Sequence, residues 1–175
     1  YMALKKILTE PNNILRQKSL QVNKINKGIQ TLMDDMLETM YAAPGIGLAA
    51  IQVGIPKRII VLDLAKDGEP KKPVFFVNPK IIWKSKNNST YEEGCLSVPG
   101  EFAEIDRPDK CHIKYLDYDG NKKELKADGL LATCIQHEMD HLEGILFIDY
   151  LSKLKKSLIA KKLNKEQKAL ERIVV

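Results

Sequence analysis

Apolar side chains recur along residues 25–40 with the spacing of one helix face. They occupy Ile25, Ile29, Leu32, Met33, Met36, Leu37 and Met40. Because this i, i+4, i+7 rhythm matches 3.6 residues per turn, it predicts an amphipathic helix that buries a methionine-rich stripe. Pro44 and Gly45 follow directly, so we expect the helix to end there and a loop to begin.

The middle of the chain is made of shorter runs that favour strands. We expect strands over residues 58–64, 74–83, 110–120 and 122–127. Turn signals separate these runs at Asp67-Gly68, Asn87-Asn88, Pro99-Gly100 and Asp119-Gly120. The last of these pairs lies between two alternating runs, a pattern that predicts a β-hairpin.

Two more helices are expected towards the C-terminus. Asp128 is placed to cap a helix that runs to about residue 142 and is closed by Gly144. A final helix should cover residues 152–170. Because strands cluster in the middle and do not alternate with helices, the chain predicts an α+β fold, with mainly antiparallel sheets around a central helix. Its 175 residues suit one domain over residues 2–175, and we expect Tyr1 to be foreign to a native chain that begins at Met2.

Composition narrows the setting. Hydrophobic residues make up 44% and charged residues 29% of the chain, which is ordinary for a soluble globular protein. No apolar run approaches the roughly 20 residues that span a bilayer, so no membrane partner is expected. Three cysteines without an export signal argue against a disulfide framework and favour a reducing, cytoplasmic setting.

The net charge of +5 is unevenly distributed. Residues 153–172 hold seven Lys and one Arg against two Glu, which sums to +6 and leaves −1 for the rest of the chain. A basic segment of this kind suits an anionic partner such as nucleic acid. The alternative is a solvated lysine face whose Leu154, Leu158 and Leu163 cover the core.

Candidate chemistry lies in the stretch QHEMDH, residues 136–141. On a helix, His137 and His141 share one face, so both imidazoles can reach one metal ion. Glu138 is close to that face and can reach a metal-bound water without binding the metal. This is the arrangement of hydrolytic H-E-x-x-H sites, which need a third ligand.

The identity of the third ligand has to be sought elsewhere in the chain. Phe147 stands where another motif histidine would follow, and the region where a thermolysin-like glutamate would lie reads IAKKLN. His112 is interpreted as an ordinary strand residue, either packed or at the surface. Cys95 lies in a glycine-flanked polar turn that could aim a thiolate at a metal. Cys134 is also conceivable, but its place on the helix of His137 favours packing beside the site. A His2Cys set with an open fourth position is a known catalytic arrangement.

Three motifs follow one another along the chain: GIGLAAIQ at 45–52, EGCLS at 93–97 and QHEMDH at 136–141. Together they resemble the signature motifs of the peptide deformylase family, over nearly the whole chain from Met2. The resemblance implies a metal-dependent hydrolase that removes the N-formyl group from the N-terminal formyl-methionine of newly synthesised proteins. It also implies Fe2+ as the native ion, one per chain, which Zn2+, Ni2+ or Co2+ can replace.

The resemblance assigns a role to each residue of the site. The metal ligands would be Cys95, His137 and His141. Metal-bound water would attack the formyl carbonyl with Glu138 as general base, while the side-chain amide of Gln52 and the backbone N–H of Leu96 stabilise the oxyanion. The nascent formyl-Met peptide would be bound by Gly45, Ile46, Gly47, Tyr91, Glu93, Gly94, Leu130, Thr133 and Cys134.

Other expectations concern the surroundings of the site and its partners. Some family members carry an arginine seven residues after the ligand cysteine, where this chain has Phe102, so contacts to later peptide residues are left open. Asp140 is expected to pair with Arg107 behind the ligand histidines. The resemblance places the basic C-terminal helix on the ribosome, through phosphate contacts that weaken with salt, and no specific DNA binding is expected.

Three other functions have to be weighed. A zinc peptidase would cleave internal peptide bonds and would have no need of Gln52 or Cys95. A non-catalytic metal-binding or ribosome-associated module would be unaffected by Glu138→Ala. Because all three motifs are present, both are disfavoured, whereas a deformylase-like enzyme for another formyl or acyl group stays open.

Overall fold

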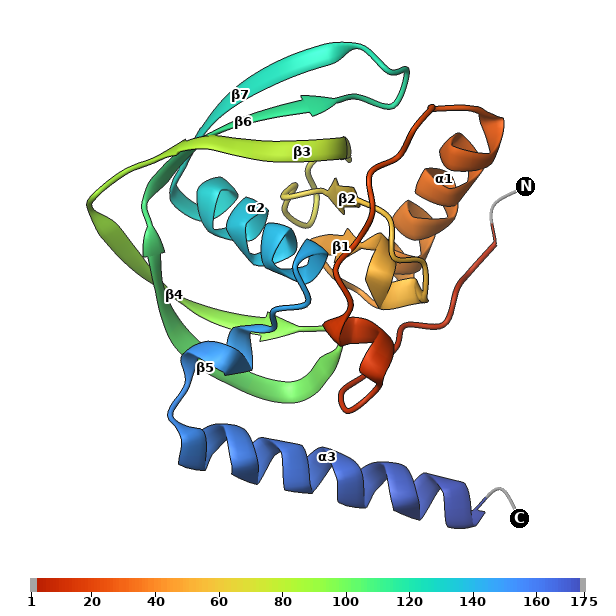
Figure 1. Cartoon of the computed structure of the whole chain (residues 1–175), viewed down its shortest axis with the longest axis vertical. Coiled ribbons are helices and arrows are strands. Elements are labelled where there is room, and N and C mark those ends of the chain that lie inside the picture. Colours follow the sequence, from red (N-terminus) through yellow and green to blue (C-terminus); the bar gives the residue numbers. More distant parts are fainter. Residues whose placement is uncertain (1–2, 174–175) are drawn as a thin grey trace.

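The computed structural model describes residues 3–173, in which helices pack with two antiparallel sheets (Figure 1). The predicted α+β class is thereby confirmed. The α-helices are α1 (Lys27–Ala42), α2 (Gly129–Leu142) and α3 (Lys153–Ile173). Short 3₁₀ turns accompany them at η1 (Asn13–Arg16), η2 (Ala50–Val53) and η3 (Phe147–Tyr150).

The larger sheet has the strand order β1-β2-β3-β6-β7, and all of its neighbouring strands are antiparallel. Its strands are β1 (Gly47–Ala49), β2 (Ile59–Leu62), β3 (Val74–Lys84), β6 (Lys110–Leu116) and β7 (Lys122–Asp128). The hairpin predicted at Asp119-Gly120 joins β6 to β7 and is confirmed. The second sheet contains β4 (Asn88–Cys95) and β5 (Val98–Pro108).

The interpretation of the EGCLS region as a polar turn is wrong, because most of this region belongs to the β4–β5 hairpin. The residues up to Cys95 belong to β4, and the turn is confined to residues 96–97. The turn expected at Pro99-Gly100 is wrong, since both residues lie within β5. The sequence conceals the hairpin because Glu93 and Arg107 are buried as an ion pair, which removes the apolar alternation of a half-buried strand.

Helix α1 confirms the amphipathic pattern, although it begins and ends two residues later than predicted. The side chain of Asn26 accepts a hydrogen bond from the backbone N–H of Ile29 and so caps the first turn. The side chains of Met33, Met36 and Met40 are fully buried, and they form one cluster with residues of β1 and β2.

Helix α2 lies between the two sheets (Figure 1). Its residues Ala132 and Ile135 pack with Ile113 of β6 in the core of the larger sheet. Asp128 precedes the helix as expected, but its side chain makes no capping hydrogen bond. Instead the strand β7 passes directly into α2 through Gly129, whose positive φ of 54° and N–H bond to the carbonyl of Asp109 make the turn.

Helix α3 runs along the outside of the molecule beyond β5 (Figure 1). Leu163 is buried and Ile159 packs beside it, as a covering helix requires. Leu154 and Leu158 are 70% and 56% exposed, so in the alternative interpretation, a solvated lysine face over the core, these two leucines do not act as covering residues. Within residues 3–173, no helix combines the length and apolarity needed to cross a membrane.

Candidate active site

The two histidines of α2 face inwards and are joined there by a cysteine. The ring centroids of His137 and His141 are 5.1 Å apart, and both side chains are buried. Cys95, at the end of β4, brings its Sγ to 3.3 Å from Nε2 of His141. One donor atom from each of these three residues lies within 4.8 Å of the other two, so the set could hold one metal ion.

The choice between the two candidate cysteines follows from this geometry. Cys134 lies outside the converging donor set, although it lines the same cavity as Cys95 and His137. Burial raises the pKa of its thiol to about 12, which keeps it protonated. The ring of His112 packs in a tilted arrangement against that of Trp83, with 4.6 Å between ring centroids, in agreement with strand packing.

Glu93 and Arg107 hold the ring of His137 from behind. A carboxylate oxygen of Glu93 accepts a hydrogen bond from Nδ1 of His137 at 2.9 Å, which leaves Nε2 for a metal. Arg107 donates to both oxygens of Glu93, at 2.6 and 3.0 Å, and to Asp140 at 2.8 Å. The expected Asp140–Arg107 pair is therefore confirmed, while the contact of Glu93 with His137 was missed.

Charge at the centre favours a bound cation. Burial lowers the pKa of His137, but its hydrogen bonds with Cys95 and Glu93 raise this pKa well above the ordinary value. The pKa of His141 is shifted the other way, well below its ordinary value, by burial and by the neighbouring His137. The raised pKa of His137 shows that the surrounding groups favour a positive charge at this position. The lowered pKa of His141 keeps its imidazole neutral, which is the metal-binding form. A divalent ion fits these residues.

Glu138 is buried beside the donor atoms. Its Oε1 lies 3.9 Å from Nε2 of His137. Its Oε2 has no hydrogen-bond partner among residues 3–173, although buried polar atoms are normally satisfied. Burial raises the pKa of Glu138 to about 7. A water molecule or a substrate group would fit this orphaned oxygen.

The side-chain amide of Gln52 is held in one orientation from η2. Its Oε1 accepts a hydrogen bond from the backbone N–H of Ala49 at 2.9 Å. Its Nε2 therefore points to the other side, where it donates to Oγ of Ser97 at 3.0 Å and lies 3.6 Å from Sγ of Cys95. Leu96 follows Cys95 in the hairpin turn, and Gln52, Cys95 and Leu96 line one cavity.

A cavity of about 710 Å³ opens onto Cys95, His137 and Glu138. All residues assigned to peptide binding from the sequence line it: Gly45, Ile46, Gly47, Tyr91, Glu93, Gly94, Leu130, Thr133 and Cys134. Phe102 also lines it, and Ile7 contributes from the N-terminal segment, which carried no motif that could have indicated it.

Comparisons with known proteins agree on one family. The polypeptide deformylase family model matches residues 4–157. A peptide deformylase of Pelagibacter ubique (strain HTCC1062) is 67% identical over 164 residues, which cover 94% of this chain and 95% of that protein. The crystal structure of peptide deformylase from Ehrlichia chaffeensis has 42% identity and a TM-score of 0.91, with 95% of this chain and 98% of that chain covered. A Met-Ala-Ser-bound peptide deformylase from Acinetobacter baumannii has 33% identity and a TM-score of 0.80, with 85% and 99% covered.

Proposed function

The chain belongs to the polypeptide deformylase family, and on that premise we propose that it hydrolyses the N-formyl group of the N-terminal formyl-methionine of newly synthesised proteins. The products are formate and a free α-amino group. The observation that carries this proposal is the convergence of Cys95, His137 and His141 beside the buried carboxylate of Glu138, on the wall of one cavity.

The metal would be held by Sγ of Cys95 and by the imidazoles of His137 and His141. When bound, a divalent ion supplies a Lewis acid and lowers the pKa of a coordinated water towards neutrality. We assign Fe2+ as the native ion, with Zn2+, Ni2+ or Co2+ as replacements. One thiolate with two imidazoles would also suit Zn2+, so metal analysis of an active preparation made without oxygen decides the assignment. Zinc alone in such a preparation would overturn it.

Glu138 is the proton carrier of the proposed reaction. Its unpartnered Oε2 accepts a proton from the attacking water, and the same carboxyl then delivers the proton to the leaving amine. A pKa raised to about 7 by burial suits both steps, because the group can take up and release a proton near neutral pH.

Gln52 and Leu96 stabilise the oxyanion that forms on the formyl oxygen when water attacks the formyl carbon. The bond from Ala49 to Oε1 of Gln52 leaves Nε2 as the inward donor, so the amide needs no rearrangement during the reaction. The backbone N–H of Leu96 supplies the second donor from the turn after Cys95. Loss of one such donor typically costs about 2.7–4 kcal/mol of barrier stabilisation.

The peptide lies extended between the two sheets. Strand β1 is the edge of the larger sheet and β4 belongs to a two-stranded sheet, so both offer backbone groups to an added strand. Gly45 and Gly47 let the peptide come close to one side, and Leu130, Thr133 and Cys134 form a wall for the methionine side chain. The A. baumannii relative in complex with Met-Ala-Ser, a peptide that begins with methionine, supports this assignment.

We also propose that the lysine-rich α3 docks on the ribosome, so that the reaction takes place in the cytoplasm where nascent chains emerge. Lys155, Lys161 and Lys165 are exposed on α3 and can contact phosphate groups. Lys162 forms an ion pair with Glu101 of the cavity wall at 3.0 Å, which ties α3 to the substrate side of the molecule.

The proposed reaction is tested by formate release from a formyl-Met tripeptide, with Fe2+-loaded protein purified without oxygen. The native chain should release formate, and Glu138→Ala should lower the rate at least about 100-fold while still binding one metal ion. The control substrate is a peptide without an N-formyl group, in which only internal peptide bonds can be cleaved. Its cleavage would favour a zinc peptidase, whereas metal binding without formate release would favour another acyl substrate.

A further inference from the structure

A chain of hydrogen bonds leads from the metal ligand His137 to the outside of the molecule. Glu93 contacts His137 at 2.9 Å, and Arg107 contacts Glu93 at 2.6 Å. Arg107 also donates to Asp140 at 2.8 Å. The same Oδ2 of Asp140 accepts a hydrogen bond from the hydroxyl of Tyr150 at 2.7 Å. Tyr150 is thus the outermost member of a series that ends at the metal centre.

Arg107 is the centre of this series, and the residue is only 4% exposed. Glu93 and Asp140 neutralise it, because a buried charge is tolerated only when it is paired. The ring of Tyr150 covers the remaining side, with the guanidinium carbon 5.0 Å from the ring centroid. Tyr150 therefore holds Asp140 by its hydroxyl and Arg107 by its ring.

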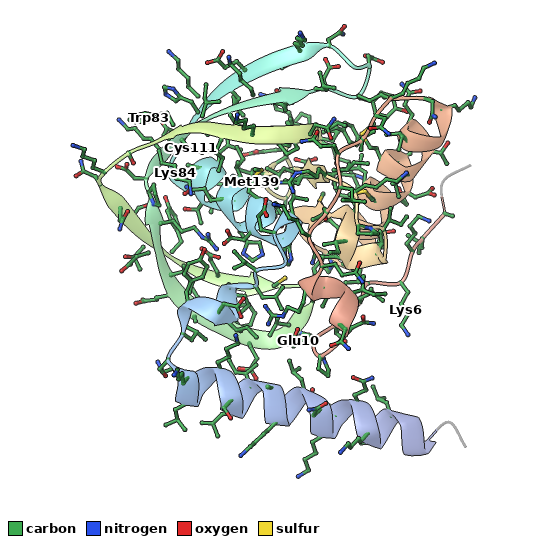
Figure 2. All side chains as sticks on the ribbon, viewed as in Figure 1. Lys6, Glu10, Trp83, Lys84, Cys111 and Met139 are labelled. Carbon is green, nitrogen blue, oxygen red and sulfur yellow. The ribbon has the colours of Figure 1, made fainter. Side chains whose placement is uncertain are left out.

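Tyr150 reaches this position from a groove that is separate from the substrate cavity. The groove is lined by Arg107, Asp140 and Tyr150, together with Trp83, Lys84 and Met139, which Figure 2 labels. It shares no lining residue with the cavity that opens onto Glu138. Tyr150 is 52% exposed there, so a change in its hydroxyl need not disturb the bound peptide.

The turn η3 that carries Tyr150 is itself fixed. Asp149 forms ion pairs with Arg16 at 2.6 Å and with Lys156 at 2.7 Å. Phe147 at the other end of η3 is buried and stacks on His137, with 6.3 Å between ring centroids. The backbone of η3 can thus hold the hydroxyl of Tyr150 against Asp140.

We propose that Tyr150 is a positioning residue that slows the escape of the metal ion. It holds Asp140 and Arg107 in place, and through them it keeps Glu93 against His137. This inference rests on the proposed function only in that the ion occupies Cys95, His137 and His141. Partners behind metal-bound histidines fix the orientation of the ring and raise its affinity for the ion.

The test compares Tyr150→Phe with a matched control, Tyr118→Phe. Phenylalanine at position 150 keeps the ring over Arg107 and removes only the hydroxyl. Tyr118 also donates a hydrogen bond to an aspartate, Oδ2 of Asp34 at 3.1 Å, and it lies in the cluster formed by α1 and the larger sheet. Both variants lose one Tyr–Asp hydrogen bond, but only one of them changes the series that leads to His137.

The readout is the rate at which Co2+ passes from the loaded protein to excess EDTA. The visible absorption of the protein-bound ion monitors this transfer. Direct partners of ligand histidines change metal affinity 10–100-fold, so we expect about 3–10-fold faster loss for the more remote Tyr150→Phe. Tyr118→Phe should release Co2+ at the native rate. Equal rates for all three proteins would overturn the proposal, as would a native chain that binds no Co2+.

Kinetics on the formyl-Met tripeptide give a second readout. With saturating metal, Tyr150→Phe should lower kcat and leave KM unchanged, because its hydroxyl lies outside the substrate cavity. A rise in KM alone would contradict a positioning role. Co2+ transfer requires no substrate, so failure of the proposed reaction and failure of this inference can be told apart.

Discussion

At Gly47 a single methyl group would reach the carboxylate of Glu138. A Cβ there would lie 2.9 Å from Oε1 of Glu138 and 2.7 Å from Cδ2 of Leu62, both too close for ordinary contacts. We predict that Gly47→Ala folds but displaces the carboxylate. A misplacement of about 1 Å can cost about 100-fold in rate, so kcat for formate release should fall roughly 10–100-fold.

Gly45→Ala provides the comparison for this prediction. The three atoms nearest to its Cβ would all belong to the side chain of Leu96, with Cδ1 at 2.8 Å, and the end of that flexible side chain can move aside. Gly45→Ala should therefore reduce kcat less than Gly47→Ala. Equal losses in the two variants would show that the effect comes from the loop and not from the position of Glu138.

Individual residues differ in how well the sequence predicts their contacts. His137, Glu138 and His141 lie within about one turn of a helix, so their spacing alone predicts that their side chains are close together. Glu93 and Arg107 are 14 residues apart on paired strands, where Glu93 is opposite Ala103 and Arg107 is opposite Ser89, so only their side chains meet. The contact between Glu93 and His137 could not be predicted, because it depends on how the hairpin packs against α2.

At the scale of elements, α1 is the element that the apolar pattern of the sequence predicts most clearly. Met36 lies in the middle of its stripe and is completely buried. We predict that Met36→Ala lowers the free energy of unfolding by about 2–5 kcal/mol, through lost burial and an unfilled cavity. Urea unfolding measures this change. Leu154→Ala on α3, at a side chain 70% exposed, should stay within about 0.5 kcal/mol of the native chain.

The hairpin of β4 and β5 shows where such patterns fail. Its inward face mixes the apolar Val98 and Ile105 with the buried charges of Glu93 and Arg107. In a sequence, the two charged residues of a buried ion pair look like surface residues, because their pairing is known only from the structure. The strands with ordinary apolar alternation, such as β3 and β6, were predicted to within a few residues.

The segment after β2 is anchored by Asp63, whose carboxylate is buried. It accepts hydrogen bonds from the hydroxyl of Tyr41 at 2.5 Å and from the backbone N–H groups of Ala65 and Lys72 at 2.9 and 3.0 Å. Burial alone would raise the pKa of Asp63, but these donors bring it below its ordinary value. The folded state therefore prefers the charged carboxylate, which makes its contribution depend on pH.

We predict that Asp63→Asn destabilises the fold at pH 7 by about 1–3 kcal/mol, since an amide NH2 would then face hydrogen-bond donors. A carboxylate with a lowered pKa stabilises above the unfolded pKa of about 3.9 and loses this contribution as pH falls through the folded value. The gap between native chain and variant, measured by urea unfolding from pH 7 downwards, should narrow below about pH 4. A constant gap would exclude the carboxylate charge as the cause. Asp67→Asn, at an exposed turn, should change little at any pH.

At the scale of the whole molecule, the lysine-rich helix α3 is linked to one wall of the substrate cavity. Figure 1 places α3 at one end of the molecule, and the β6–β7 hairpin at the opposite end. The ion pair of Lys162 with Glu101 joins α3 to the strand that borders the substrate cavity. A ribosome bound through α3 would therefore lie next to the part of the cavity wall that carries Glu101.

We predict that reversing three exposed lysines of α3, in Lys155→Glu/Lys161→Glu/Lys165→Glu, weakens cosedimentation with ribosomes. The matched control reverses Lys122, Lys123 and Lys126 of β7, which are also exposed and change the net charge equally. If α3 contacts phosphate groups, only the first variant loses binding, and its binding also depends less steeply on salt, because fewer counterions are released. Both variants should keep the native rate of formate release. Equal loss in the two would show that net charge, and not α3, attracts the ribosome.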